Sequence, residues 1–227
     1  MKEIMIQNRK IKLFAECKAE YILIHPTGQH EIDSLETEYE MLKSGTERDF
    51  ALVSFEVKNW NDELSPWKAK QAFGNELFGD RAESTLQFIT DELIPSLQEY
   101  MNSDTKIILG GYSLAGLFSL WSAYQTGIFH AVAACSPSVW IENWIEFANE
   151  NPLLVSNIYL SIGNKEHKTR NPMLRNVKNN IEEQYEIFRN SGINTVLEIN
   201  SGNHFQDNTE RLVKGFLWCI EQTGGNK

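Results

Sequence analysis

The 227-residue sequence lacks the long apolar runs of membrane and secreted proteins and the clustered basic residues of nucleic-acid-binding proteins. No segment approaches the roughly 18 consecutive apolar residues that span a bilayer, and the first residues contain no apolar run of signal-peptide length. Positive charge is also scarce, with 21 Lys and Arg against 31 Asp and Glu. Nucleic acid and anionic lipid bind through clustered basic residues, so neither is an expected partner. We expect a cytoplasmic protein with an acidic surface.

Cysteine and linker sequences are equally sparse. Cys17, Cys135 and Cys219 are odd in number and widely spaced, which favours reduced thiols over a disulfide framework or a zinc site. We therefore expect neither a metal nor a cofactor. No internal repeat or low-complexity tract divides the chain, and 41% of its residues are hydrophobic, enough for one sizeable core. The sequence predicts a single domain over residues 1–227.

Short apolar runs alternate with segments of helical spacing. Strands are predicted over residues 9–14, 20–25, 50–55, 106–109, 131–135, 157–162 and 195–199. Helices are predicted over residues 32–45, 80–101, 113–124 and 177–188, with a last helix through 212–220. Parallel strands need crossover connections, so this rhythm indicates an α/β fold with a mostly parallel sheet and helices on both faces. Ligands in such folds bind at the carboxyl ends of the strands.

A strand, a tight turn and a helix surround Ser113. The sequence GGYSLAG at residues 110–116 places Gly111 and Ala115 two positions before and after the serine. Small residues at these positions are typical of the G-x-S-x-G nucleophile elbow of α/β-hydrolases, with alanine here replacing the second glycine. Such a turn would place the Leu114 amide where it can stabilise an oxyanion. The same residues would also permit Ser113 to be an ordinary helix N-cap.

Chain order selects partners for this serine, because in the α/β-hydrolase fold the acid and then the histidine follow it on later loops. Of five histidines, only His204 follows the last predicted strand, and Glu166 is the first carboxylate after the strand at 157–162. We predict Ser113 as nucleophile, His204 as base and Glu166 as the acid that orients the histidine. Asp207 is a competing acid, although its position also suits an N-cap. Glu166 could alternatively be a surface carboxylate paired with nearby basic residues.

Several segments together resemble a known branch of the α/β-hydrolases. These are GGYSLAGLFSLW at 110–121, SPSVW at 136–140, SIGNKEHKTRNP at 161–172, SGNH at 201–204 and WNDELSPW at 60–67. They are similar to the esterase D and enterochelin-esterase-like branch. The resemblance implies hydrolysis of carboxylic esters through an acyl-enzyme, with Ser113, Glu166 and His204 at the triad positions. Secreted and periplasmic relatives that open siderophore lactones or feruloyl esters carry a signal peptide or an extra domain, and we expect neither in this chain.

The substrate is therefore expected to be a small-molecule ester of undefined acyl group and alcohol. Two alternative functions use the same residues: an acyltransferase with an alcohol acceptor, and a hydrolase-fold protein that binds without turnover. The amide of Gly28 or Gln29 is the expected second oxyanion donor, although any strand-to-helix turn could have this sequence. Aromatic residues near strand ends are candidates for the substrate pocket, and core packing would explain each of them as well. They are Trp60, Trp67, Phe78, Tyr112 and Trp140.

Overall fold

One eight-stranded sheet organises the molecule in the computed structural model, which describes residues 1–16, 18–28, 34–72, 74 and 76–224. The spatial order is β1-β2-β4-β3-β5-β6-β7-β8. The strands are β1 (Lys2–Ile6), β2 (Arg9–Phe14), β3 (Ala19–Thr27), β4 (Phe50–Glu56), β5 (Met101–Tyr112), β6 (Ala131–Cys135), β7 (Asn157–Gly163) and β8 (Asn194–Asn200). Only the β1–β2 and β2–β4 pairs are antiparallel. The predicted α/β-hydrolase fold with its mostly parallel sheet is confirmed.

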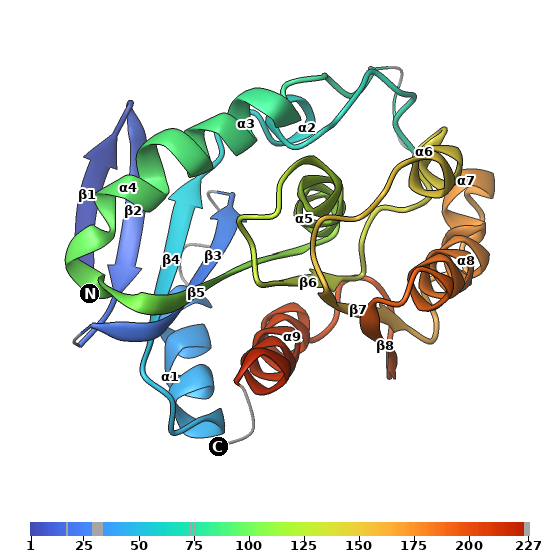
Figure 1. Ribbon diagram of the computed structural model, residues 1–227. Coiled ribbons are helices and arrows are strands. Elements are labelled where there is room, and N and C mark those ends of the chain that lie inside the picture. Colours follow the sequence, from blue (N-terminus) through green and yellow to red (C-terminus); the bar gives the residue numbers. More distant parts are fainter. Residues whose placement is uncertain (17, 29–33, 73, 75, 225–227) are drawn as a thin grey trace.

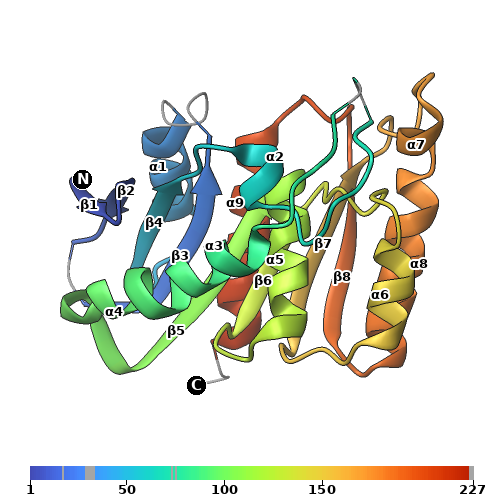
Figure 2. The same cartoon turned by 90° about the horizontal axis from the view of Figure 1, so that it is seen from above.

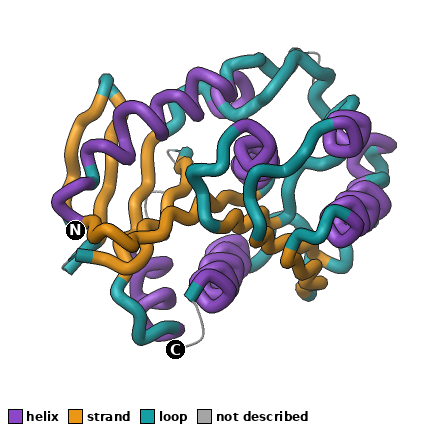
Figure 3. Tube along the Cα trace, viewed as in Figure 1, coloured by secondary structure: helices purple, strands orange, loops and turns teal. Residues whose placement is uncertain are grey.

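Helices cover both faces of the sheet (Figure 1). On one face lie α1 (Leu35–Gly45) and α9 (Asn208–Thr223), which contact each other. The opposite face carries α3 (Ala82–Phe88), α4 (Ile94–Ser96), α5 (Leu114–Gln125), α6 (Trp144–Glu150) and α8 (Val177–Asn190). Figure 2 looks onto the face that carries α3, α5 and α6, and Figure 3, viewed as in Figure 1, shows the strands between the two helical layers. Two short helices, α2 (Trp60–Glu63) and α7 (Pro172–Arg175), lie in the connections after β4 and β7.

The central strands are buried on both sides, as parallel strands under two helical layers must be. All five residues of β6 are buried, and three of them are alanines. Their small side chains let α9 approach closely: a Cβ added to Gly215 would lie 3.1 Å from the Ala133 Cβ and 3.2 Å from the Cys135 Sγ. This close contact sets the position of α9, and with it the position of Arg211 four residues earlier.

Three local differences from the sequence prediction have physical causes. Strand β1 was not predicted, and most of its residues are exposed in an edge hairpin with β2. The helix predicted over 80–101 is irregular: α3, a π-helical turn over Ile89–Leu93 and α4 follow one another without a gap, and the missing N–H of Pro95 interrupts the regular ladder. Met101 then begins β5, which is longer than the strand predicted over 106–109 because its first residues are mostly polar and lack the pattern of a buried strand. Ile32, assigned to the first predicted helix, lies outside the described residues.

Within the described part of the chain, every helix is too short or too polar to cross a membrane. Cys135 and Cys219 are buried free thiols, and Cys17 lies outside the described residues. The same described residues contain no group of three or more His, Cys, Asp or Glu side chains able to hold a metal ion.

Candidate active site

The turn between β5 and α5 presents Ser113 in a strained conformation. Its φ and ψ are 58° and −119°, a positive-φ state that costs a non-glycine residue roughly 1–3 kcal/mol. The backbone of Ser113 is held by its neighbours, since its N–H donates to the Cys135 carbonyl at 3.0 Å. A Cβ added to Gly111 would lie 2.5 Å from the carbonyl oxygen of Ala115. The elbow therefore requires glycine at 111, while it accommodates alanine at 115.

Three side chains distant in the sequence form one hydrogen-bonded chain. His204 Nε2 lies 2.9 Å from Ser113 Oγ, and His204 Nδ1 lies 2.9 Å from Glu166 Oε2. Ser113 follows β5, Glu166 follows β7 and His204 follows β8. These strands run parallel, so their carboxyl ends meet at one edge of the sheet. The structure thus brings together the three residues predicted as nucleophile, base and acid.

Glu166 is buried and held at both carboxylate oxygens. Oε2 faces His204, while Oε1 accepts hydrogen bonds from the Ser136 hydroxyl at 2.7 Å, the Gly163 amide at 2.7 Å and Arg211 Nη1 at 3.1 Å. Burial alone raises the pKa of Glu166, but the bond and charge of His204 and the bonds from Ser136 and Gly163 lower it on balance. Glu166 is therefore held as a carboxylate, the form that fixes the Nδ1–H tautomer of the imidazole.

The competing acid, Asp207, does not take this place. It occupies the N-cap position of α9 in a left-handed conformation with φ 56°, and its side chain makes no capping hydrogen bond. Its side chain is exposed. The contact with His204 Nδ1 belongs to Glu166.

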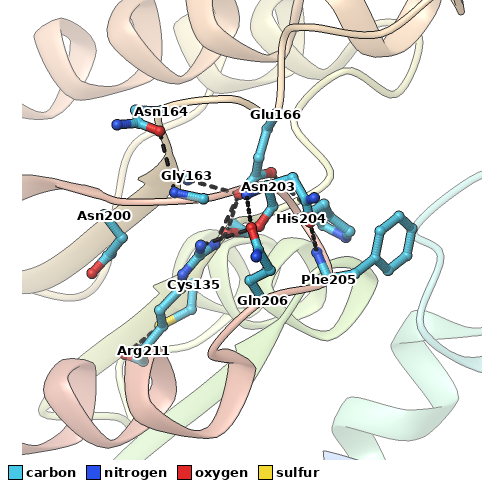
Figure 4. Close-up of polar contacts among 12 residues, drawn as sticks. Cys135, Gly163, Asn164, Glu166, Asn200, Asn203, His204, Phe205, Gln206 and Arg211 are labelled. Carbon is cyan, nitrogen blue, oxygen red and sulfur yellow. Dashed lines mark hydrogen bonds and ion pairs between the residues drawn. The ribbon is translucent and has the colours of Figure 1, made fainter.

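A cavity of about 500 Å³ opens directly above Ser113 and His204. Three of the predicted aromatic residues line it, namely Trp60, Phe78 and Trp140, and the rings of the last two lie 6.0 Å apart. Phe205, which was not predicted, also lines the cavity and is 83% exposed. Its ring points away from the polar contacts around Glu166 and His204 (Figure 4). Lys165 and Lys168 line the cavity from the connection between β7 and α7.

Two predicted pocket residues do not line this cavity. Trp67 packs against Trp144 and Phe147 and donates its Nε1 hydrogen to the Glu142 carbonyl. Tyr112, the last residue of β5, belongs to the hydrophobic cluster on the α9 side of the sheet. Successive side chains of a strand point to opposite faces, and this alternation turns the tyrosine ring away from the cavity.

Two of the three predicted oxyanion donors, Leu114 and Gly28, lie within the described residues. Leu114 is the first residue of α5 and lines the cavity, and amides in the first turn of a helix have no acceptor within the helix. Gly28 directly follows β3, the strand beside β5, at the same edge of the sheet. Gln29 lies outside the described residues. Leu114 thus follows the nucleophile at the start of the helix and beside the cavity, and its amide stays the predicted oxyanion donor.

Two polar residues of the site were missed by sequence reasoning. Ser136 has a positive φ of 44° and donates to Glu166, and the signal for it was a small polar residue directly after a predicted strand. Arg211 is 1% exposed and contacts both Glu166 and the loop that carries His204. It shares a helical spacing of four with the buried residues Gly215 and Cys219, so an arginine on a buried helix face was the available signal.

Comparisons with known proteins identify the family of the chain. The model of the Esterase family, described as "Putative esterase", matches residues 28–217 of the chain. The chain belongs to this esterase family. Family membership makes it a carboxylic ester hydrolase, as the resemblance of its motifs predicted. No curated protein matches the chain.

Solved structures similar to this esterase include siderophore hydrolases, a serine hydrolase and an enterobactin esterase. The siderophore hydrolase EstA from Aspergillus nidulans has a TM-score of 0.75 and 17% identity, over 98% of this chain and 94% of that one. An IroE-like serine hydrolase from Shewanella oneidensis has a TM-score of 0.74 and 14% identity, over 96% of this chain and 78% of that one. The enterobactin esterase FES from Shigella flexneri has a TM-score of 0.67 and 15% identity, over 97% of this chain and 59% of that one. At these identities the likeness establishes the fold.

Proposed function

We propose that this esterase hydrolyses small carboxylic esters through an acyl intermediate on Ser113. The observation that carries the proposal is the unbroken hydrogen-bonded chain from Ser113 through His204 to Glu166 beside an open cavity. The ester carbonyl would lie above Ser113 Oγ, in reach of the Leu114 amide. The apolar wall formed by Trp60, Phe78 and Trp140 suits an apolar acyl or alcohol group.

The proposed reaction has two halves, acylation and deacylation, and the same imidazole accepts and donates a proton in each. His204 Nε2 accepts the Ser113 proton as Oγ attacks the ester carbonyl, and Glu166 stabilises the imidazolium. The oxyanion is stabilised by the Leu114 amide, with Gly28 or Gln29 as the proposed second donor. His204 then protonates the departing alcohol. In the second half a water molecule, deprotonated by His204, attacks the acyl carbonyl; the bond to Ser113 Oγ then breaks, His204 returns the proton to Oγ, and the carboxylic acid is released.

A comparison of wild type with Ser113→Ala tests this role. Wild type should hydrolyse a short p-nitrophenyl ester and gain the mass of one phosphonyl group on reaction with a fluorophosphonate, because both reactions need an activated serine. Ser113→Ala should be folded by circular dichroism and lack both reactions. A folded Ser113→Ala protein with wild-type hydrolysis would rule out Ser113 as the nucleophile.

The substrate class and the acceptor can be tested in the same assay. A panel of p-nitrophenyl esters of increasing acyl length tests whether the apolar wall binds the acyl group. A siderophore ester tests the activity named for the structural neighbours. Product analysis with added alcohols distinguishes hydrolysis from acyl transfer, since transfer would yield a new ester in place of the free acid. The cytoplasmic location expected from the sequence remains a prediction.

A further inference from the structure

The guanidinium group of Arg211 lies buried beneath the three triad residues. Its Nη1 donates to Glu166 Oε1 at 3.1 Å, and its Nη2 donates to the carbonyl oxygens of Ser201 at 2.9 Å and Asn203 at 3.1 Å. Figure 4 shows the side chain reaching from α9 into the group of polar contacts around Glu166 and Asn203. One planar cation thus contacts both the acid and the segment that leads into His204.

The same cation also acts on the other side of His204 through a tyrosine. Arg211 Nη1 donates to the Tyr112 hydroxyl at 2.9 Å, and this hydroxyl donates to the carbonyl oxygen of His204 at 2.9 Å. The carbonyls of Ser201, Asn203 and His204 are therefore all tied, directly or through Tyr112, to one buried group. The Arg211 guanidinium therefore fixes both Glu166 and the backbone segment from which the His204 imidazole projects.

Arginine suits this place for two physical reasons. Its five N–H donors lie in a fixed plane, so one side of the fork can bind the carboxylate while the other binds two carbonyls. Its permanent charge also compensates that of Glu166, which is buried and would be costly to keep ionised without a partner. A lysine ammonium keeps the charge but is a single point on a flexible stem, and cannot hold both sets of acceptors at once.

We propose that Arg211 is a positioning residue of this esterase: it orients Glu166 and the His204 segment together, so that the imidazole stays within hydrogen-bonding distance of Ser113. The inference rests on the proposed serine mechanism. Arg211 is not among the residues that line the cavity, so it acts through Glu166 and His204 and not on the substrate. Its loss should therefore affect turnover more than substrate binding.

The test uses Arg211→Lys in the full chain, assayed with the p-nitrophenyl ester. We expect kcat to fall about 10- to 100-fold, the effect of an ångström-scale misplacement, with KM within about twofold of wild type. The downfield proton NMR signal of an imidazole Nδ1–H bonded to a carboxylate should weaken or shift in the folded variant. A merely structural role would lower the melting temperature and leave this signal and kcat unchanged.

Arg9→Lys is the matched control, because Arg9 forms another largely buried ion pair, with Glu63 at 2.5 Å. It should lower the melting temperature without a change in kcat. Tyr112→Phe removes one hydroxyl and provides a milder second variant if Arg211→Lys does not fold; it should lower kcat about threefold or more. Wild-type kcat in folded Arg211→Lys, or in Tyr112→Phe when the lysine variant is unfolded, would overturn the proposal. Activity in Ser113→Ala would instead overturn the proposed function.

Discussion

Replacement of Glu166 by glutamine should invert the tautomer of His204. The carboxylate accepts the His204 Nδ1 hydrogen at Oε2, and Oε1 accepts from the Gly163 amide and from Arg211. Neither of these two donors can accept a hydrogen bond, so the glutamine oxygen should take the Oε1 position and its NH2 group should face Nδ1. His204 would then carry its proton on Nε2, where it cannot accept the proton of Ser113.

The opposite orientation of the glutamine amide is the less stable one. It would aim an NH2 group at the Gly163 amide and at Arg211, and each unsatisfied buried donor costs about 1–3 kcal/mol. With the glutamine oxygen at the Oε1 position and the His204 proton on Nε2, none of these donors is left unsatisfied in the resting enzyme. We therefore expect kcat to fall about 10⁴-fold, the effect of a wrong histidine tautomer in a triad, which corresponds to about 5 kcal/mol of transition-state stabilisation.

The assay is hydrolysis of p-nitrophenyl acetate under conditions in which circular dichroism shows the variant to be folded. Glu198→Gln is the matched control, because Glu198 accepts hydrogen bonds from Lys214 at 2.6 Å and Tyr159 at 2.7 Å outside the cavity lining. It should retain wild-type kcat. A folded Glu166→Gln enzyme with more than about a tenth of wild-type kcat would refute the tautomer argument.

Three further predictions follow from the same contacts. Gly111→Ala should lower kcat at least about tenfold, because the added Cβ displaces the elbow; an unchanged kcat would show that the turn relaxes freely. Trp140→Ala should raise KM for long-chain esters about tenfold by removing a cavity wall, whereas Trp67→Ala should lower only the melting temperature; equal KM effects would contradict the assigned lining. The lowered pKa of Glu166 stabilises the fold fully above about pH 4.5 and less as the pH falls through the folded-state pKa, because the unfolded chain takes up the proton first. Urea titrations at a series of acidic pH values should therefore show that the free energy of unfolding falls more steeply with decreasing pH in wild type than in Glu166→Gln. The same dependence on pH in both proteins would contradict this.

Local periodicity was sufficient for most of the fold. The run at 131–135 is apolar throughout and forms β6, and the apolar spacing at 113–124 forms α5. The helix predicted over 80–101 forms, but with a π-helical turn before Pro95, and its predicted end was wrong because Met101 already belongs to β5. Strand β1 was not predicted because most of its residues are exposed, so it lacks the apolar run of a buried strand and forms by pairing with β2.

Sequence motifs alone were enough to predict the elbow at Ser113 and the chain order that assigns Glu166 and His204 to later loops at the same edge of the sheet. Both follow from local rules: small residues where a turn is tight, and parallel strands where helices alternate with strands. The folded chain was needed to show that Trp60 lines the cavity while Trp67 packs elsewhere, and that Arg211 contacts both Glu166 and the segment leading into His204. Such contacts depend on which side chains from separate elements converge in space, and the spacing of apolar residues along one segment does not specify which distant residues that segment contacts.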